Sequence, residues 1–298
     1  MKQRSYPTTG CEPIAKSRLE RLERRLNSLA TLALHVGAVL AVVFVRPRWS
    51  DVLIALAFYL GGMFVITAGY HRYFAHRSYK TSRVFQTVLA ALGCLCTQKG
   101  ALWWAATHRH HHRYTDSPGD PHSPHQRGFW HSHILWTLSS ESDGHDQAAV
   151  RDLSKYPELR LLDRFCTVPL VAYIAFTALV GGLEGIAWWY CVPTVALMHA
   201  VMLINSASHL WGHRRFATSD QSRNNAWLAV LTLGEGWHNN HHRYMASARQ
   251  GFYPWQIDVT YYGLRALQAL GVIWDLREPP AAVLEEGRAR SADASRAA

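Results

Sequence analysis

The chain has 298 residues, of which 49% are hydrophobic and only 17% are charged, and it carries a net charge of +10. This apolar content excludes a disordered protein, and the five scattered cysteines exclude a small disulfide scaffold. The basic excess is typical of proteins that bind nucleic acid or lie at a membrane surface. The long apolar segments described next favour the membrane, so we expect no nucleic-acid partner.

Two apolar segments follow a basic N-terminal segment, residues 1–28. They cover about residues 29–45 and 52–68, and each is close to the ~20 residues that a helix needs to cross a bilayer. The first is followed by Arg-Pro-Arg-Trp, without a small-residue cleavage site, so we predict a retained anchor rather than a signal peptide.

Further along the chain, a short apolar run at Val84–Thr97 contains Gln86 and predicts a half-buried or interfacial helix. Two more segments, at about 168–183 and 186–204, are again long enough to span. A buried core helix of a soluble protein is the alternative for each segment. Four such segments in one chain favour an integral, multi-pass membrane protein.

Lysine and arginine residues gather in 1–28, in 71–167 and after residue 204. Because basic residues are retained on the cytoplasmic side, we predict that both termini and the long central segment are cytoplasmic. We expect a membrane domain over 29–253, a cytoplasmic helix over 254–277 and a disordered tail over 278–298, where alanine, proline and charged residues dominate.

Histidines are the chemically informative residues, and eighteen of them are present. They form the strings HRYFAH from His71, HRHHH from His108 and HNNHH from His238, with a further histidine at the end of NSASH. Positions i, i+3 and i+4 share one face of a helix, so the second and third strings each present three histidines on one face. His110 points away from this face, and we do not expect it to bind metal.

Nine histidines in this arrangement exceed what one metal ion can use, and they predict a dinuclear centre. Imidazole ligands suit iron, zinc, copper or nickel, so the spacing alone leaves the metal open. A non-catalytic metal store is the alternative, but it would favour runs in a loop rather than helical spacing. We therefore predict an all-α fold of four transmembrane helices with a cytoplasmic helical cap that holds a histidine-rich dimetal centre.

These strings, with GEGW before the last one, resemble the histidine boxes of the integral-membrane acyl desaturases, the stearoyl-CoA desaturase family. The similarity extends from about Ile66 to Tyr253 and includes Thr115–Asp116 and Asp120–Pro121–His122. The resemblance implies two iron ions that use dioxygen and two electrons to insert a cis double bond into a long acyl chain, most often at delta-9. The implied ligands are His71, His76, His108, His111, His112, His209, His238, His241 and His242, with Asn205 holding a metal-bound water.

The resemblance also implies an apolar substrate tunnel. Trp104 matches the family's tunnel tryptophan, Gln98 matches a polar residue at the bend, and Tyr59 and Met63 fall where the family closes the tunnel. For Tyr59 and Met63, ordinary packing is an equally good interpretation. The expected partners are a long-chain acyl-CoA, or else acyl carrier protein or a phospholipid, and an external electron donor such as a ferredoxin, a b-type cytochrome or a flavin reductase.

The chain departs from the family near the expected headgroup site. Ala106–Thr107 replaces an Arg-Asp pair, Lys99 replaces an asparagine, and Met202 replaces a tryptophan. These changes leave the carrier of the acyl chain open. Two other classes stay as alternatives: a membrane di-iron fatty-acid or sterol hydroxylase, and a metal transporter, for which His35 and His199 are the only histidines inside the predicted spans.

Overall fold

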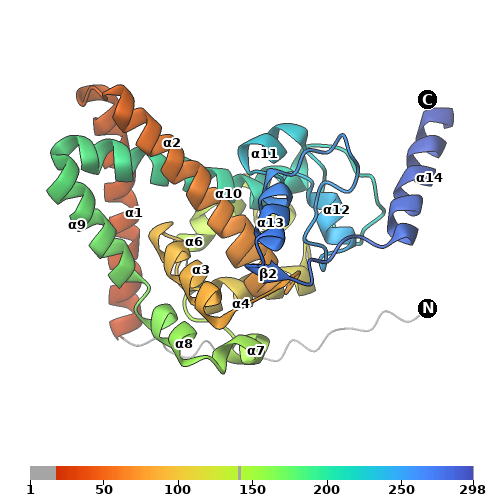
Figure 1. The fold of residues 1–298 in the computed structure, drawn as a ribbon, viewed down its shortest axis with the longest axis horizontal. Coiled ribbons are helices and arrows are strands. Elements are labelled where there is room, and N and C mark those ends of the chain that lie inside the picture. Colours follow the sequence, from red (N-terminus) through yellow and green to blue (C-terminus); the bar gives the residue numbers. More distant parts are fainter. Residues whose placement is uncertain (1–17, 140–141, 298) are drawn as a thin grey trace.

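The computed structural model of the protein describes residues 18–139 and 142–297. It is mostly helical, and its long helices lie to one side of the shorter helices and loops (Figure 1). The elements up to residue 138 are α1 (Arg18–Phe44), α2 (Trp49–Phe64), the π-helix η1 (Val65–Ala75), β1 (Lys80–Thr81), α3 (Arg83–Leu95), α4 (Ala101–Tyr114), α5 (Pro124–Arg127), the π-helix η2 (His131–Leu135) and α6 (Trp136–Leu138).

The remaining elements follow in the same manner. They are the 3-10 helix η4 (Gln147–Val150), α7 (Arg151–Ser154), α8 (Pro157–Arg164), α9 (Thr167–Glu184), the π-helix η5 (Gly185–Cys191), α10 (Val192–Leu210), α11 (Ala226–Leu231), α12 (His238–Arg243), α13 (Val259–Ala269), β2 (Ile273–Trp274) and α14 (Ala281–Ala297). The two short strands pair antiparallel, with Lys80 opposite Trp274.

Three helical runs are long and apolar enough to cross a membrane, where the sequence predicts four spans. They are Arg24–Phe44, Trp49–Ala75 and Thr167–Leu210. The first two contain the predicted spans 29–45 and 52–68 almost completely. The third run contains both remaining spans, with a kink at Gly182 near their junction and η5 at the start of the second one.

The third run is a helical hairpin. Straight, its 44 residues would extend ~66 Å, about twice the thickness of a bilayer core. Gly182 breaks the helix with φ 58° and ψ −137°. Across this break, the Tyr173 hydroxyl donates a hydrogen bond of 2.7 Å to the carbonyl of Trp189, a residue that a straight helix would place ~24 Å away.

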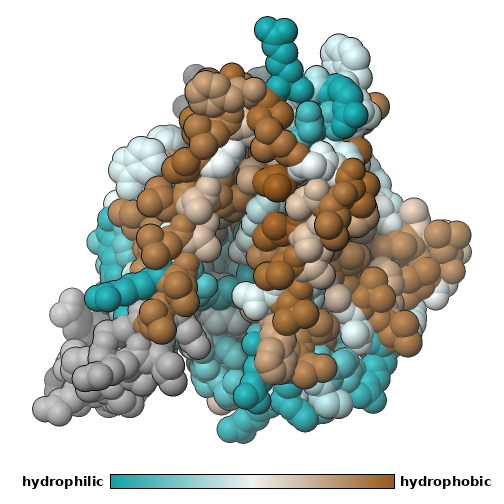
Figure 2. All heavy atoms as spheres, turned by 90° about the vertical axis from the view of Figure 1, so that its left-hand side faces the viewer, coloured by the Kyte–Doolittle hydropathy of each residue, from teal (hydrophilic) through white to brown (hydrophobic). Residues whose placement is uncertain are grey.

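The outer faces of the long helices are apolar. Leu29 and Val39 on α1, Leu53 on α2, and Val171 and Leu179 on α9 are all exposed. Figure 2 shows the face formed by this side of the molecule, where hydrophobic side chains predominate. Such a large exposed apolar surface is typical of contact with lipid.

The buried core lies around η1, which α2 continues directly. Helices α3 and α4 pack against η1, and α10 packs against α2. Tyr70, Phe74, Leu102 and Leu197 are fully buried there. The run at 84–97 is amphipathic, as the sequence predicts: α3 buries Leu89 and exposes other apolar side chains.

The C-terminal region differs from the expectation. The sequence predicts one helix over 254–277, and the structure has the shorter α13 followed by β2. The tail from residue 278, predicted to be disordered, contains the helix α14. Its first turns pack Val283 against Phe216 and Tyr253, and Arg243 forms an ion pair of 2.6 Å with Glu286. These tertiary contacts offset the weak apolar pattern of the tail.

Candidate metal centre

Four helical segments bring the histidines to one place. His71 lies within η1 and His76 caps its end, three histidines project from one face of α4, His209 lies in the last turn of α10, and α12 supplies the rest. The structure gathers all nine histidines predicted as ligands into two clusters. The five-histidine cluster contains His71, His76, His108, His112 and His241, and the four-histidine cluster contains His111, His209, His238 and His242.

Within the five-histidine cluster, the Nε2 atoms converge. The Nε2–Nε2 distance is 2.8 Å between His76 and His108, 3.0 Å between His108 and His112, and 2.9 Å between His112 and His241. The Nε2 of His71 is 3.1 Å from that of His241. The second cluster repeats this arrangement, since the Nε2 of His238 is 3.0 Å from those of His209 and His242.

These spacings fit imidazoles around an ion. Metal–imidazole bonds are ~2.1 Å long, and two such bonds at a right angle place their nitrogens ~3 Å apart. In each cluster several Nε2 atoms lie that close together, and an imidazole has only one ring proton to share when it is neutral. The residues present therefore fit a metal ion in each cluster better than a network of hydrogen bonds.

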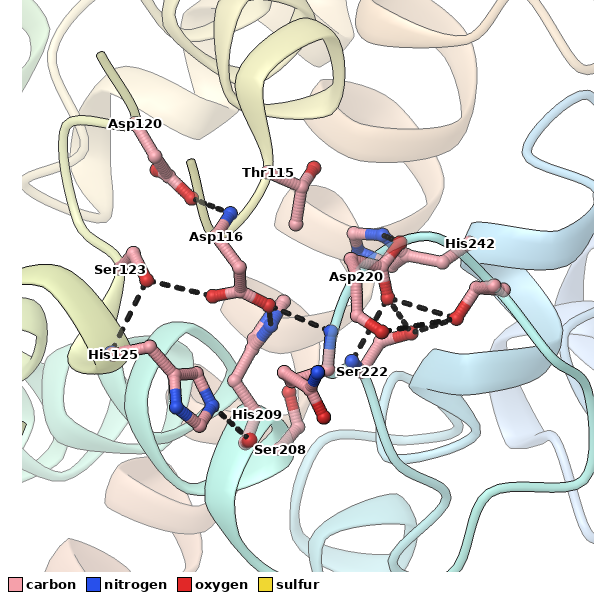
Figure 3. A network of polar contacts seen from close by, with 12 residues as sticks. Thr115, Asp116, Asp120, Ser123, His125, Ser208, His209, Asp220, Ser222 and His242 are labelled. Carbon is pink, nitrogen blue, oxygen red and sulfur yellow. Dashed lines mark hydrogen bonds and ion pairs between the residues drawn. The ribbon is translucent and has the colours of Figure 1, made fainter. Parts of the chain in front are cut away.

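Carboxylates hold the opposite nitrogens of the four-histidine cluster (Figure 3). The Nδ1 of His209 lies 2.9 Å from Asp116, and the Nδ1 of His242 lies 3.0 Å from Asp220. Asp120 similarly lies 3.0 Å from the Nδ1 of His111. A carboxylate accepts a hydrogen bond from Nδ1–H, which leaves the lone pair of Nε2 free for a metal and makes the imidazole more basic.

A buried ionic network supports the five-histidine cluster. Glu235 contacts the Nδ1 of His71 with one carboxylate oxygen. Its other oxygen accepts hydrogen bonds of 3.2 and 3.0 Å from the Arg72 guanidinium. Arg72 also donates to Asp258, which caps the start of α13 through the amide of Tyr261. This network connects three segments beside the His71 ring: η1, the loop before α12, and α13.

Burial keeps most of these imidazoles neutral. It lowers the pKa of His108, His112, His238 and His241 well below the ordinary value, and it lowers that of His242 to about 4 even beside a carboxylate. Neutral imidazole is the form that binds metals. His111 differs, because the attraction of Asp120 outweighs burial and raises its pKa. The negative electrostatic potential that Asp120 creates at the His111 ring favours a proton there, and it favours a metal cation for the same reason.

Buried carboxyl groups near the clusters are ionised. Burial alone would raise the pKa of Asp116 and Asp220, but hydrogen bonds from His209 and His242 outweigh it and lower both values far below the usual range. Negative charge beside each ring is thus available to balance a cation. These carboxylates were not predicted as functional residues, although Thr115–Asp116 and Asp120 lie in the strings that resemble the family.

Three further polar residues complete the description of the centre. Asn205 lies one turn before His209 on α10, and its carbonyl accepts a hydrogen bond from Ser132. His122 is buried beside His111, and its Nδ1 has no hydrogen-bond partner among the described residues. His110 is exposed, as its outward direction on the helix predicts, and its ring contacts the carbonyl of Gly119 and the Tyr114 ring rather than either cluster.

A cavity of about 520 Å³ adjoins the histidines, and His108, His122 and Asn205 form part of its wall. Of the predicted tunnel residues, Trp104 and Gln98 line this cavity. The Trp104 ring stacks on His108, with 4.9 Å between ring centroids. The cavity volume lies in the range usual for sites that bind organic ligands.

Tyr59 and Met63, by contrast, do not line this cavity. Met63 is fully buried in the core around η1. The Tyr59 hydroxyl donates a hydrogen bond of 2.8 Å to the carbonyl of Leu231. Both side chains contact neighbouring segments of the fold, and their role in closing a tunnel stays a prediction.

Comparison with known proteins places this geometry in context. The family model described as fatty acid desaturase matches residues 47–274. Delta-9 acyl-lipid desaturase 2 of Arabidopsis thaliana is 38% identical over 266 residues, which cover 87% of this chain and 86% of that protein. Acyl-CoA C20 Delta5-desaturase of Anemone leveillei is 40% identical over 254 residues, covering 83% and 81% of the two chains. The sn-1 stearoyl-lipid 9-desaturase of Anabaena variabilis is 35% identical over 254 residues, covering 85% and 93%.

Proposed function

The chain belongs to the fatty acid desaturase family, and on that premise we propose that it inserts a cis double bond at delta-9 of a long-chain acyl group. The convergence of nine histidine ring nitrogens in two clusters is the observation that carries the proposal. The reaction would consume one dioxygen, two electrons and two protons, and would release two waters for each double bond formed.

Two iron ions are the proposed cofactor, one in each histidine cluster. Bound iron would supply the strong oxidant that an unactivated methylene requires and that no acid or base side chain offers. Asn205, at the edge of the four-histidine cluster, would hold a water there. The carboxylates Asp116, Asp120 and Asp220 fix the orientation of three rings, and Glu235 does the same for His71.

The protein contributes the position of the substrate. Trp104 and Gln98 line the cavity beside His108, so an acyl chain in this cavity would pass close to the histidines. Its wall carries apolar side chains such as Met198 and Val201, which exclude water and favour the hydrocarbon. The chain would be held with its reactive carbons next to the metal centre.

We further propose a topology of four membrane passes, with the Thr167–Leu210 hairpin supplying two of them. The basic N-terminal segment and the histidine centre would then face the cytoplasm, as would the C-terminal end. Electrons would come from a separate protein on that side, such as a ferredoxin, a b-type cytochrome or a flavin reductase.

The test is a fatty-acid methyl ester profile from a host that lacks its own desaturase but holds a redox partner. Wild-type protein is expected to produce a new cis-monoene with its double bond at delta-9. His111→Ala is expected to abolish it, and His110→Ala, a neighbouring histidine outside both clusters, is expected to retain it. A hydroxylated chain, or an unchanged profile with the protein expressed and iron bound, would contradict the proposal.

A further inference from the structure

A second cavity, of about 510 Å³, shares no lining residue with the cavity beside the histidines. Its walls come from the segment that leads from η1 into β1 and from the segment that follows β2. Three of its lining residues are basic and one is acidic, so the walls carry an excess of positive charge. The lining consists of Arg77, Tyr79, Lys80, Asp275, Leu276 and Arg277.

Backbone hydrogen bonds hold the two walls in place. The amide of Arg277 donates a hydrogen bond of 2.9 Å to the carbonyl of Ser78. The carbonyl of Arg277 accepts a hydrogen bond of 2.8 Å from the amide of Ala248. Beside these contacts, Lys80 pairs with Trp274 in the antiparallel ladder of β1 and β2. The spacing of the walls is therefore fixed by the backbone and not only by mobile side chains.

Two arginines of the lining have hydrogen-bond donors to spare. The Arg277 side chain is exposed and makes no hydrogen bond or ion pair with the residues that the structure describes. The Nη1 of Arg77 is buried and likewise has no partner among them. The Nε of Arg77 lies 3.8 Å from Asp152, but that carboxylate already accepts hydrogen bonds of 2.7 and 3.1 Å from Arg109. Buried donors are normally satisfied, so the two guanidinium groups indicate an anionic ligand.

The acidic residue of the lining offsets only one of the three cations. Asp275 lies 2.6 Å from the ammonium of Lys80, and the two side chains are 57% and 63% exposed. Water screens such an exposed pair, and the arginines are outside it. Two guanidinium groups at one cavity suit a phosphate, whose oxygens accept paired hydrogen bonds from the planar fork of each group.

The cavity lies where a membrane run ends. Arg77 is two residues beyond the run Trp49–Ala75. Trp274 is 44% exposed, and it shares a face of the ladder with Lys80 because residues directly opposite each other point the same way. Directly after β1, one stripe of α3 exposes Val84, Val88 and Leu92. Exposed tryptophan and apolar side chains beside basic residues are typical of the membrane–water interface.

We propose that this cavity binds the phosphate of an anionic membrane phospholipid, with Arg77 and Arg277 as the phosphate-binding residues. The lipid would be a bound ligand and not the substrate, because the two cavities have no wall residue in common. The proposal goes beyond the desaturase function and does not depend on it. The headgroup would join the segment after η1 to the segment after β2 and would hold this edge of the protein against an anionic leaflet.

Titration with defined ligands tests the site. The full-length protein in detergent micelles receives dioleoyl phosphatidylglycerol, dioleoyl phosphatidylcholine or glycerol 3-phosphate, which carries the phosphate without acyl chains. Native mass spectrometry reports the affinity for the first molecule bound. Phosphatidylglycerol is expected to bind at least about tenfold more tightly than either of the other two ligands, a difference of about 1.4 kcal/mol.

Three matched variants locate the binding. Arg277→Gln and Arg77→Gln are each expected to weaken phosphatidylglycerol binding by about tenfold, because each loses charge-assisted hydrogen bonds to the phosphate. Arg83→Gln removes the same charge from the same edge, at an exposed residue outside the cavity, and is expected to stay within about twofold of wild type. Melting temperatures without lipid verify the fold, and the exposed position of Arg277 makes its variant the safer of the two.

Three results would overturn the proposal. Equal affinity for the two lipids would show that the cavity does not select an anionic headgroup. An equal loss of affinity in all three variants would show diffuse attraction to a basic surface. Glycerol 3-phosphate bound as tightly as phosphatidylglycerol would assign the cavity to a soluble phosphate in place of a membrane lipid.

Discussion

At the scale of single residues, the Nδ1 atoms of the histidines are as informative about the centre as the Nε2 atoms that approach one another within each cluster. Three of the four rings in the smaller cluster meet a carboxylate through Nδ1. In the larger cluster one ring, that of His71, meets a carboxylate, Glu235, and Arg72 neutralises its charge. The smaller cluster therefore carries more unbalanced negative charge, which favours a bound cation.

Removing one of these charges is expected to weaken metal binding without removing a ligand. Asp220→Asn keeps the shape of the side chain but no longer fixes the Nδ1 proton of His242 as strongly. Loss of such a partner lowers metal affinity by roughly 10- to 100-fold, so the variant is expected to retain less iron at a fixed chelator concentration. Elemental analysis after dialysis measures the change. Asp275→Asn, at an exposed ion pair with Lys80, is the control and is expected to match wild type.

The sequence predicts the histidines of the centre but not their supports. Helical spacing places three histidines on one face of α4 and three on α12, because i, i+3 and i+4 positions share a face whatever the tertiary fold. The carboxylates come from other segments: Asp116 is 93 residues from His209, and Asp220 reaches α12 from a loop. No local pattern encodes such a pairing. Tyr59 and Met63 lie outside the lining of the cavity beside His108.

At the scale of elements, the turn of the hairpin depends on one backbone conformation. Gly182 has φ 58° and ψ −137°, a region that residues with a Cβ avoid. Gly182→Ala is expected to destabilise the protein by about 1–3 kcal/mol and to lower its melting temperature in detergent. Gly61 lies in a helix, and nothing lies within 4 Å of the methyl group that alanine would add there. Gly61→Ala is therefore expected to leave the melting temperature unchanged or to raise it slightly. Equal melting temperatures for the two variants would show that the turn does not need glycine.

Apolar length predicts most of the membrane elements, since a run of about 20 apolar residues has few other stable environments. It does not predict how the two arms of the hairpin pack against each other across the kink at Gly182. Tyr173 against Trp189 and Phe58 against Tyr173 are contacts between distant segments. The helix α14 likewise depends on contacts with residues far along the chain.

At the scale of the whole molecule, Arg72 links the membrane part to the C-terminal part. It is 1% exposed, and it bonds to Glu235, Asp258 and the carbonyl of Ala248. Arg72→Gln leaves two buried carboxylates without their cation, a loss that typically costs about 3–5 kcal/mol. The expected result is a much lower melting temperature together with reduced iron content, because Glu235 also holds His71.

Arg83→Gln is the matched control for this prediction. Arg83 pairs with Glu158 at 2.7 Å, but its side chain is 61% exposed. Exposed ion pairs contribute little because water screens them, so this variant is expected to melt close to wild type. An Arg72→Gln protein as stable as Arg83→Gln would mean that the network does not join the two parts of the fold.

The most direct test of the central proposal, that the nine histidines hold two iron ions, is the iron content of the purified protein. Plasma mass spectrometry of wild type expressed in iron-supplemented cells is expected to give two iron ions per chain. His238→Ala is expected to lose iron from the four-histidine cluster, and His110→Ala to retain both ions. One ion or fewer in wild type, or zinc in place of iron, would contradict the claim.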